Sequence, residues 1–357
     1  MNYADFFMSK RFRFGFVCYE ETSSPDIKNI DFWNRLEIEP FVIMTHPETQ
    51  TYITKGLTST AVFIGDVFVC DGDQTIEELT LALINEDSWD SLDKLSGRFA
   101  LLILSEQGGK VLNDPFGART IYYREKGDFC VGSHSALIAE LFGEEKNEET
   151  QKFIQCPEYQ QRGTFYLPGD LTVFTNVYGL IPNNYLDIKN RQTKRYWPRK
   201  PLEPSDVKSF YESFDHYFLR FTNFLRGKYK PVLGLTIGVD SRLLIANFKF
   251  NDLHFRTVTW GGHWITEKEL PLVNAMDKYL GCENLYLDFL RPEDSQYWDE
   301  YQKLLNCNTG YSGSSPDNSD ELLPAAMGQS CKDGEVFIRG YGGEIIRGFY
   351  NLHDKIR

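Results

Sequence analysis

The stretch Pro231–Phe248, PVLGLTIGVDSRLLIANF, carries the pattern of a strand, a tight loop and the start of a helix. It opens with an apolar run that ends at Leu235, passes through the turn Thr236–Val239 and enters a segment of helical periodicity at Asp240–Ser241. Helix N-termini favour Asp and Ser. The stretch therefore predicts a β-strand that is followed, after a short loop, by an α-helix.

This loop has the properties of a phosphate site. Successive backbone N–H groups and the positive end of the helix dipole attract phosphate. The carboxylate of Asp240 at the rim can hold the Mg²⁺ ion that accompanies phosphate. The loop is not GxxxxGK[ST], because no lysine precedes Ser241, and it is not GxGxxG. A βα turn in a Rossmann-like sheet without a nucleotide has the same pattern, so the stretch alone leaves both interpretations open.

Composition limits the classes of function. A chain of 357 residues is long for one domain and suits two. The net charge of −13 and the pI near 5.0 argue against nucleic acid as a partner, whereas ATP needs only a local cradle and a metal. No apolar signal segment and no run of membrane-spanning length is present in the sequence. We expect a soluble, cytoplasmic protein with no nucleic-acid or membrane partner.

The cysteines and histidines form no metal-ligand pattern. The seven cysteines lack C-x-x-C spacing and are odd in number, which predicts free, buried thiols in a reducing compartment. The cysteines are Cys18, Cys70, Cys130, Cys156, Cys282, Cys307 and Cys331. The histidines are His46, His134, His216, His254, His263 and His353, and we expect them to be surface or core residues.

The first half of the chain alternates strand-like runs with turn residues. Runs rich in β-branched and aromatic residues predict strands over Phe12–Tyr19, Phe41–Thr45, Thr51–Thr54 and Ala61–Val69. Helical spacing predicts helices over Thr75–Asn85 and Ser135–Phe142. Turn residues at Gly108–Gly109, Lys126–Asp128 and Pro182–Asn184 each predict a flanking pair of strands.

The second half of the sequence differs from the first in its order of predicted strands and helices. The proline-rich, charged stretch Pro198–Ser205 predicts a domain boundary, and Ser205 is expected to cap a helix with an aromatic stripe that Gly227 ends. Beyond the central loop, strands alternate with helices, which predicts a parallel sheet with ligands at the carboxyl ends of its strands. The expected strands are Phe255–Trp260, Asn284–Phe289 and Glu335–Arg339, and the expected helices are Glu267–Leu280, Gln296–Leu305 and Glu321–Ser330.

Two phrases of the second half resemble a known family. The central loop is similar to the SGGxDS pyrophosphate loop of ATP-pyrophosphatase enzymes, in the DSR form met among relatives of asparagine synthetase. The phrase RGYGGEIIRGFY at Arg339–Tyr350 is similar to the SGEGADELFGGY phrase of asparagine synthetases, with matches at Gly340, Gly342, Gly348 and Tyr350. Its glycines let the backbone approach a ligand closely. Glu344 stands where the family has an aspartate that binds magnesium.

The first half resembles the glutaminase-like domain of the same family. The phrases LSGRFALLIL, LNDPFGARTIYY and VGSHSALIAEL are similar to it in order and spacing, and Asp114, Gly117 and Tyr122 fit its D-x-x-G-x-x-x-x-Y pattern. The resemblance implies a chain with α/β and α+β parts. An N-terminal nucleophile-type αββα sandwich over residues 1–200 would precede a Rossmann-like, parallel-sheet ATP-pyrophosphatase domain over residues 201–357.

The residues for glutamine hydrolysis are missing. The family uses a cysteine at residue 2, exposed by removal of Met1, as its nucleophile. This chain has Asn2, which has no nucleophilic atom, and its first cysteine, Cys18, lies within a predicted strand. The run Ile64–Val69 stands where an Asn-Gly-Glu phrase would bind glutamine. We therefore expect the first half to persist as a scaffold without glutaminase activity.

The resemblance implies an ATP-dependent, AMP-forming amide ligase. Such an enzyme activates a carboxylate as an acyl-adenylate and then transfers it to nitrogen, here ammonia or an amine. Asp240 and Glu344 would hold Mg²⁺, Thr259 and its neighbours would lie near the adenine, and no catalytic residue can be assigned. The residues expected to bind ATP are Thr236, Ile237, Gly238, Val239, Asp240, Ser241, Thr259 and Gly340.

Three departures keep a second class open. Ile237 replaces a loop glycine, and a β-branched residue at a position that needs positive φ costs about 1–3 kcal/mol or imposes another loop shape. Tyr341 replaces a catalytic glutamate. Family members continue into a helical region with a catalytic lysine, whereas this sequence stops at Arg357, so a partner chain would have to supply that region. The alternative is a catalytically inactive relative that binds a nucleotide or a partner protein.

Overall fold

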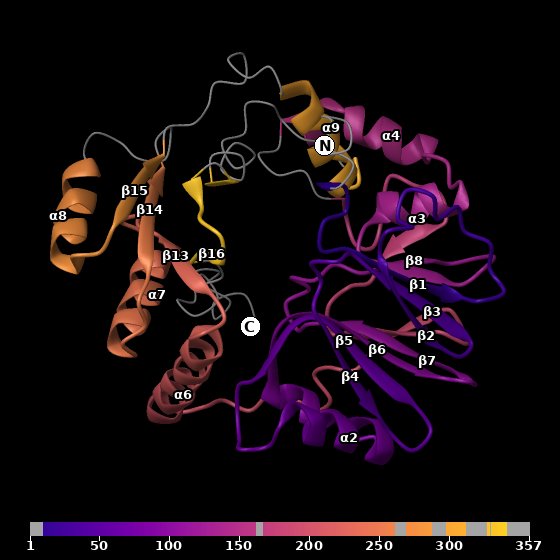
Figure 1. Cartoon of the computed structure of the whole chain (residues 1–357), viewed down its shortest axis with the longest axis horizontal. Helices are drawn as coiled ribbons and strands as arrows, with labels where there is room; N and C mark the ends of the chain where they lie inside the picture. Colours follow the sequence, from indigo (N-terminus) through magenta and orange to yellow (C-terminus); the bar gives the residue numbers. More distant parts are fainter. Residues whose placement is uncertain are drawn as a thin grey trace, which may run out of the picture. The chain divides into compact units, whose positions relative to one another are not determined.

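The computed structural model describes residues 10–161, 167–260, 269–287, 298–311, 327–328 and 330–340. The chain divides into two compact units, which Figure 1 colours along the sequence. The first unit comprises Met1–Ser205 and Gln296–Ser314, and the second comprises Asp206–Ser295 and Ser315–Arg357. The assignment of residues 1–200 and 201–357 to the two domains of the asparagine synthetase family stays a prediction.

Two antiparallel sheets, each of six described strands, form the first unit. The first sheet has the order β10-β8-β9-β1-β3-β2, with β1 (Phe16–Glu20), β2 (Asn34–Ile38), β3 (Phe41–Thr45), β8 (Tyr122–Arg124), β9 (Cys130–Gly132) and β10 (Val177–Gly179). The second has the order β12-β11-β7-β6-β5-β4, with β4 (Thr51–Lys55), β5 (Thr60–Val69), β6 (Leu95–Ser105), β7 (Gly108–Asn113), β11 (Asn184–Asp187) and β12 (Gln192–Arg195).

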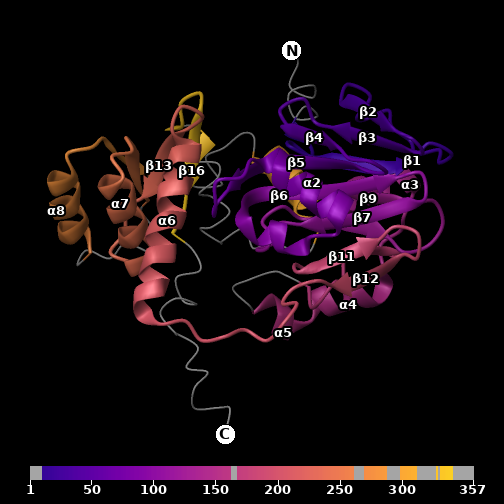
Figure 2. The same cartoon turned by 90° about the horizontal axis from the view of Figure 1, so that it is seen from below.

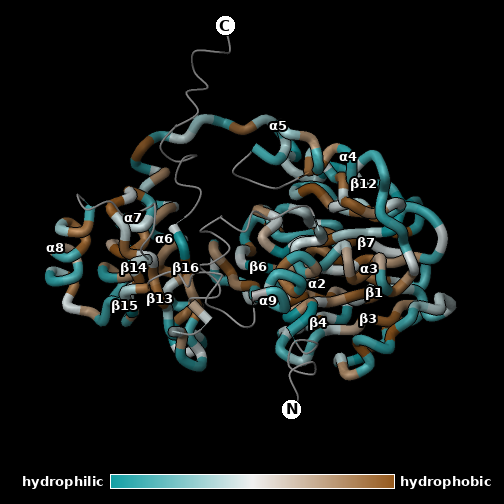
Figure 3. The backbone as a smooth tube through the Cα atoms, turned by 90° about the horizontal axis from the view of Figure 1, so that it is seen from above, coloured by the Kyte–Doolittle hydropathy of each residue, from teal (hydrophilic) through white to brown (hydrophobic). Residues whose placement is uncertain are grey.

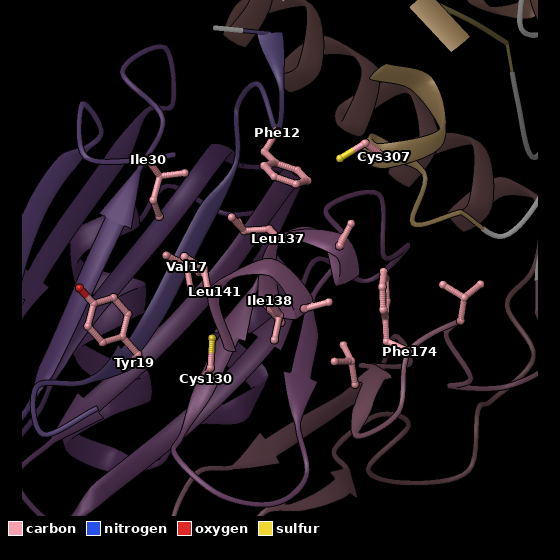
Figure 4. Packing of buried hydrophobic residues seen from close by; sticks show 14 of the residues in the cluster. Phe12, Val17, Tyr19, Ile30, Cys130, Leu137, Ile138, Leu141, Phe174 and Cys307 are labelled. Atoms are coloured by element: carbon pink, nitrogen blue, oxygen red, sulfur yellow. The ribbon is translucent and has the colours of Figure 1, made fainter. Parts of the chain in front are cut away.

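Helices pack on the outer faces of these sheets. The helical elements of the first unit are α2 (Ile76–Glu86), the 3₁₀ turn η1 (Trp89–Lys94), α3 (Ser135–Phe142), α4 (Glu148–Gln155), α5 (Pro157–Gln160) and α9 (Trp298–Asn308). Neighbouring residues of a strand point to opposite faces. Val17 of β1 therefore packs with Leu137 of α3, as Figure 4 shows, whereas Cys18 packs between the two sheets. Phe63 of the second sheet packs against Leu79 of α2.

Two turns differ from their predictions. The turn between β6 and β7 consists of Glu106–Gln107, so the prediction that Gly108–Gly109 forms it is wrong. Gly109 lies inside β7. A Cβ atom at this position would be 2.0 Å from the carbonyl oxygen of Ile103, so the glycine allows β6 and β7 to pair closely. Strands β10 and β11 flank Pro182–Asn183, whereas Asn184, which was predicted to belong to the turn, is the first residue of β11, and the two strands belong to different sheets.

A four-stranded parallel sheet, counted over the described residues, forms the second unit and confirms the predicted parallel arrangement. Its order is β15-β14-β13-β16, with β13 (Lys230–Gly234), β14 (Arg256–Trp260), β15 (Asn284–Leu287) and β16 (Glu335–Ile338). Helices α6 (Val207–Leu225), α7 (Val239–Phe250) and α8 (Leu270–Leu280) accompany it (Figure 2). The predicted helix at Glu321–Ser330 lies mostly outside the described residues.

Helices α6, α7 and α8 pack on one face of the sheet of this unit. Leu233 of β13 belongs to a cluster with Phe248 of α7 and Val273 of α8, whereas the adjacent Val232 packs on the other face with Val258 of β14. The apolar colouring of the strands in Figure 3 reflects burial on both faces.

The cap of α6 is one residue later than predicted. Asp206, not Ser205, caps the helix, because its Oδ1 accepts a hydrogen bond from the backbone N–H of Ser209 at 3.0 Å. Gly227, which was expected to end the helix, has φ +81° and follows its C-cap, Arg226.

Helix α9 packs in the first unit, although its residues belong to the second half of the sequence. The backbone N–H of Phe12 donates to Asn308 Oδ1 at 2.9 Å, and Cys307 is 3% exposed in the cluster of the first sheet. Figure 4 shows Cys307 beside Phe12. A segment near the end of the chain therefore completes the core near its beginning.

The coarse fold prediction is confirmed: the described chain is mixed α/β, with antiparallel sheets and one parallel sheet. The N-terminal nucleophile type of the first unit stays a prediction. All seven cysteines are free, as predicted, but only Cys18, Cys130 and Cys307 are fully buried. Among the described residues, no helix combines the length and apolar character that crossing a membrane requires.

Candidate functional site

A pocket of about 420 Å³ lies in the second unit, at the carboxyl ends of its parallel strands. Strand β13 leads through α7 to β14 on one side, and β16 pairs with β13 on the other side. The pocket thus lies where the strand order reverses, which is the usual ligand site of open parallel sheets. The described lining residues are Gly234, Thr236, Ile237, Gly238, Asp240, Ser241, Trp260, Glu269, Val273, Arg339 and Gly340.

The loop after β13 delivers the N-terminus of α7 to this pocket. Gly238 is the N-cap, with φ −60° and ψ 143°, and it provides no side-chain cap. The N–H groups of a first helical turn have no acceptor within their own helix and carry the positive end of the dipole. An anion in the pocket therefore faces a positive backbone surface.

Ser241 and Thr236 fix the shape of the loop. Their hydroxyl oxygens are 2.7 Å apart, and Ser241 Oγ donates to the carbonyl oxygen of Gly238 at 3.0 Å. The backbone N–H of Gly238 donates in turn to Thr236 Oγ1 at 3.2 Å. These contacts tie both ends of the loop together and leave two hydroxyl groups at the lining of the pocket.

Gly340, which follows β16, lies against the first turn of α7. A Cβ atom at this position would be 2.6 Å from the backbone nitrogen of Ser241 and 2.7 Å from the carbonyl carbon of Asp240. No side chain fits at such distances, so glycine is required for this approach. The second glycine-rich phrase therefore begins directly beside the phosphate-type loop.

Charged groups of both signs line the pocket. Asp240 stands in the first turn of α7, where the dipole favours a carboxylate, and Glu269 contributes a second carboxylate. Arg339 brings a guanidinium whose Cζ lies 5.9 Å from the centre of the Trp260 ring. A cation near the positive helix terminus is suited to a ligand with several negative charges.

The structure does not bring all the predicted binding residues to the pocket. Thr236, Ile237, Gly238, Asp240, Ser241 and Gly340 line it. Val239 is 47% exposed in the first turn of α7, and its side chain adds no polar group. Thr259 is fully buried, and its hydroxyl donates to the carbonyl oxygen of Leu235 at 3.0 Å. Glu344 lies outside the described residues.

The sequence left two possibilities for Ile237, a strained positive φ or a different loop shape, and the structure has the different loop shape. It is not among the described residues with positive φ, and its side chain packs on the apolar cluster of α7 and β13. The loop therefore avoids the strain that a left-handed β-branched residue would carry. It also presents fewer flexible positions than a glycine-rich loop would.

A metal would find few protein ligands here. Among the described residues, no group of three or more His, Cys, Asp and Glu side chains could hold a metal ion. Asp240 is the carboxylate on the loop itself. Mg²⁺ commonly binds through one or two carboxylates together with the phosphates of a substrate and water, so the donor set fits a phosphate-bound Mg²⁺ and not a dedicated metal centre.

The sequence predictions did not include five of the lining residues, which are Gly234, Trp260, Glu269, Val273 and Arg339. Arg339 is the first residue of the phrase Arg339–Tyr350, so its place in that phrase was the available signal. Trp260 ends the strand for which only Thr259 was named, and the side-chain alternation of a strand explains why one faces inward and the other the pocket. Glu269 and Val273 reach the pocket from the start of α8, which no local pattern indicates.

No family model matches the chain, and no curated protein matches it. Among solved structures, the chain is similar to a glutamine-dependent NAD⁺ synthetase from Acinetobacter baumannii in complex with ADP, with TM-score 0.29, 14% identity and 50% of this chain covered. This chain covers 34% of that protein, so it spans about a third of its length.

Two further solved structures are similar at the same level. One is described as the allosteric regulatory enzyme of purine biosynthesis, with TM-score 0.31, 10% identity, and 87% of this chain and 74% of that chain covered. The other is a glutamine phosphoribosylpyrophosphate amidotransferase from B. subtilis complexed with ADP and GMP, with TM-score 0.29, 11% identity and 85% of each chain covered. At these TM-scores the likenesses carry no argument about this chain.

Cys18 and Asp114 of the first unit are both buried and have structural roles. Cys18 is fully buried in β1, and burial raises the pKa of its thiol, which disfavours the nucleophilic thiolate. Asp114 is also fully buried and accepts hydrogen bonds from the backbone N–H groups of Phe116, Ala118 and Arg119. This carboxylate shapes the D-x-x-G turn, which accounts for that pattern structurally.

A pocket of about 390 Å³ in the first unit has a different character. The Thr120 hydroxyl donates to the carbonyl of Ser133, and that of Thr172 to the carbonyl of Val177. Its described lining includes Ser135 at the N-terminus of α3 but no arginine, and no glycine-rich loop follows a parallel strand there. We therefore place the candidate site in the second unit.

Proposed function

We propose that the second unit binds Mg·ATP and that the chain is an AMP-forming amide ligase similar to asparagine synthetases. The observation that carries this proposal is the convergence of two loops on one pocket. Thr236–Ser241 follows β13, Arg339–Gly340 follows β16, and both line the crevice where the strand order reverses. Each loop belongs to a phrase that resembles the nucleotide site of that family.

The reaction needs a cradle for pyrophosphate and positive charge near phosphorus. Ser241 and the backbone of the loop would hold the departing pyrophosphate. Arg339 would stabilise the negative charge that develops on the phosphate oxygens. Asp240 and Glu344 would hold Mg²⁺, which when bound neutralises the phosphates.

The first unit would be a nucleophile-free scaffold of the N-terminal nucleophile type. One observation supports this part of the proposal: Cys18, the first cysteine in the sequence, is buried within β1. Nitrogen would then come from free ammonia or an amine, and not from glutamine cleaved by the same chain. A partner chain that supplies the family's catalytic lysine belongs to the same proposal.

Exchange of labelled pyrophosphate into ATP tests the ligase. With a suitable carboxylic acid, Mg²⁺ and the candidate partner chain, the full chain should catalyse exchange, and Asp240→Asn should slow it by roughly tenfold or more through weakened metal binding. Asp215→Asn, a change at an exposed carboxylate of α6, is the matched control and should leave exchange unchanged. Calorimetry that detects no binding of ATP at millimolar concentration would remove the proposal.

A catalytically inactive, nucleotide-binding protein is the second candidate. The substitution of a loop glycine by Ile237, with its different backbone shape, favours this reading. Binding of Mg·ATP without pyrophosphate exchange, for any acid and after addition of the candidate partner chain, would support it over the ligase.

A further inference from the structure

A second pocket of about 420 Å³ adjoins the candidate nucleotide pocket within the same unit. Asp240, Arg339 and Gly340 line both pockets, so these residues mark the junction between them. The rest of the described lining is aromatic or aliphatic. It consists mainly of Phe214, Tyr217, Phe218 and Phe221 from α6 and of Leu243 and Leu244 from α7.

The aromatic wall follows from the sequence of α6. Its four aromatic residues are spaced i, i+3, i+4 and i+7, which places them on one face of a helix. Their rings contact one another, with centroids 4.7 Å apart for Phe214 and Phe218, and Phe221 also contacts Phe248 of α7 at 5.9 Å. These contacts restrict the rings, so the wall is formed before any ligand arrives.

The charges of this second pocket are concentrated at one end. Among its described lining residues, Asp240 and Arg339 are the charged ones, and both lie at the junction with the first pocket. A ligand that carries a charge at its far end would leave that charge among aromatic and aliphatic side chains. Such burial without a partner is costly. The lining therefore matches a ligand with one charged end and an apolar body.

We propose that this second pocket holds the body of the carboxylate substrate, and that the substrate is a monocarboxylic acid with an aromatic or branched aliphatic group. The inference rests on the proposed ligase function. The carboxylate lies at the junction, where Arg339 pairs with it and the first pocket presents the α-phosphate of ATP. An acid with a second charged group, such as aspartate, has no described partner for it here.

This placement fits the bond changes of the reaction. A carboxylate oxygen bonds to the α-phosphorus, the bond from that phosphorus to the oxygen bridging to the β-phosphate breaks, and pyrophosphate leaves with the electron pair. The acyl-adenylate then loses AMP as the nitrogen of ammonia or an amine bonds to the carbonyl carbon, and the nitrogen releases a proton. Both steps require the carboxylate at the border between the two pockets.

The test measures acid binding to the full chain that is loaded with Mg²⁺ and an ATP analogue with a methylene group between the α- and β-phosphorus. Calorimetric titration should give tighter binding of 3-phenylpropionate than of aspartate, by about tenfold or more, as expected for burying a phenyl group in a preformed pocket. Leu244→Trp fills the pocket and should weaken 3-phenylpropionate binding to a similar extent while leaving binding of the ATP analogue unchanged.

Matched variants separate this effect from misfolding. Leu219→Trp introduces the same side chain at a 45% exposed position of α6 and should leave both ligands unaffected. Phe218→Leu removes ring area without adding volume and should also weaken 3-phenylpropionate binding. Circular dichroism and thermal melting establish that each variant is folded.

Each outcome points to one of the two proposals. Failure of the wild-type chain to bind the ATP analogue, measured first and alone, would overturn the proposed ligase function. Normal binding of the analogue with equal or tighter binding of aspartate would overturn only the substrate class. Loss of the analogue in Leu244→Trp, with 3-phenylpropionate retained, would show that the apolar pocket holds the nucleobase and would also overturn the inference.

Discussion

Gly340 lies so close to α7 that the backbone on either side cannot move independently. The Cβ of an alanine would stand 2.6 Å from the backbone nitrogen of Ser241, and the nearest obstacles are backbone atoms, which cannot rotate away. The glycine thus couples the loop after β16 to the first turn of α7. A nucleotide site that uses both loops depends on this approach.

Gly340→Ala is therefore expected to separate the two loops. We predict a loss of about 1–3 kcal/mol in the free energy of unfolding, as for an overpacked core position, together with a loss of ATP binding. Urea denaturation and calorimetry measure the two effects. Gly328→Ala is the control, because a Cβ atom there meets nothing within 4 Å. Normal ATP binding in Gly340→Ala would show that the two loops do not share a ligand.

The folded chain disfavours a positive charge on the imidazole of His134. Burial, together with the nearby Arg119 and Arg98, lowers the pKa of this side chain to about 3. Its ring packs on Phe12 at 5.2 Å, and its Nδ1 lies 2.8 Å from Ser133 Oγ. The folded chain therefore holds the neutral imidazole, whereas the unfolded chain takes up a proton below about pH 6.5.

The sign of the pH effect follows. A group with a lowered folded pKa contributes stability above its unfolded pKa and loses it as the pH falls towards the folded value. Between pH 7 and pH 5, the wild type should lose about 2 kcal/mol more stability than His134→Asn, which cannot take up the proton. Urea denaturation at both pH values measures this difference. The exposed His254, changed to Asn, is the control, and an equal pH response of wild type and His134→Asn would contradict the assignment.

At the scale of single elements, the N-terminus of α2 is determined by residues next to it in the sequence. Thr75 Oγ1 accepts from the backbone N–H of Glu78 at 3.1 Å, and the Glu78 carboxylate accepts from the backbone N–H of Thr75 at 2.7 Å. This reciprocal pair is a capping box. The helix was predicted over Thr75–Asn85, and the structure places it at Ile76–Glu86.

Thr75→Ala removes the cap and should lower the free energy of unfolding by about 1 kcal/mol. Because α2 packs on the outer face of the second sheet, amide exchange should quicken in the first turn of α2 more than in β5. Thr58→Ala, at an exposed loop position, serves as the control and should remain within about 0.5 kcal/mol of the wild type. Unchanged exchange at the start of α2 would show that the cap adds nothing.

Helices and strands that their own residues mark could be predicted from the sequence. Strands whose position depends on pairing with segments far away in the sequence could not. β2 was missed because its residues, NRLEI, lie on an edge with only partial burial, so no apolar run marks it. The strands that pair with β10 and β11 could not be predicted, because the sheet that each of them joins depends on strands far away in the sequence. The same holds for the candidate site. The loop Thr236–Ser241 could be predicted from its own sequence, whereas the contribution of Glu269 and Val273 could not, because they come from the start of another helix, α8.

At the scale of the whole chain, stability depends on contacts between segments that are distant in sequence. In the second unit, Arg256 donates to Glu335 at 2.6 Å and to Glu283 at 2.7 Å. The pair links the starts of β14 and β16 across β13, which lies between them. Only 9% of the Arg256 side chain and 4% of the Glu335 side chain are exposed.

Removal of the Glu335 charge would leave Arg256 with the more exposed Glu283 as its carboxylate partner. Glu335→Gln should therefore lower the stability of the second unit by about 1–3 kcal/mol, because the guanidinium of Arg256 loses its buried carboxylate. Glu212→Gln, an exposed change in an i, i+4 pair with Lys208 on α6, is the control and should have little effect. Calorimetry, with amide exchange in β13 and β16 as the local measure, separates the second unit from the first.

The same pair gives a pH signature. Burial by itself favours the neutral acid of Glu335, but the hydrogen bonds from Arg256 and from the backbone N–H of Lys332 outweigh it, so the pKa of Glu335 is lowered. A lowered carboxylate pKa contributes stability above the unfolded value of about 4.3, and this contribution is lost as the pH falls through the folded value. The difference between wild type and Glu335→Gln should therefore be full at pH 6 and shrink as the solution is acidified below pH 4. A difference that stays constant down to pH 3 would mean that Glu335 acts through its shape, and that its charge does not hold β14 and β16 together.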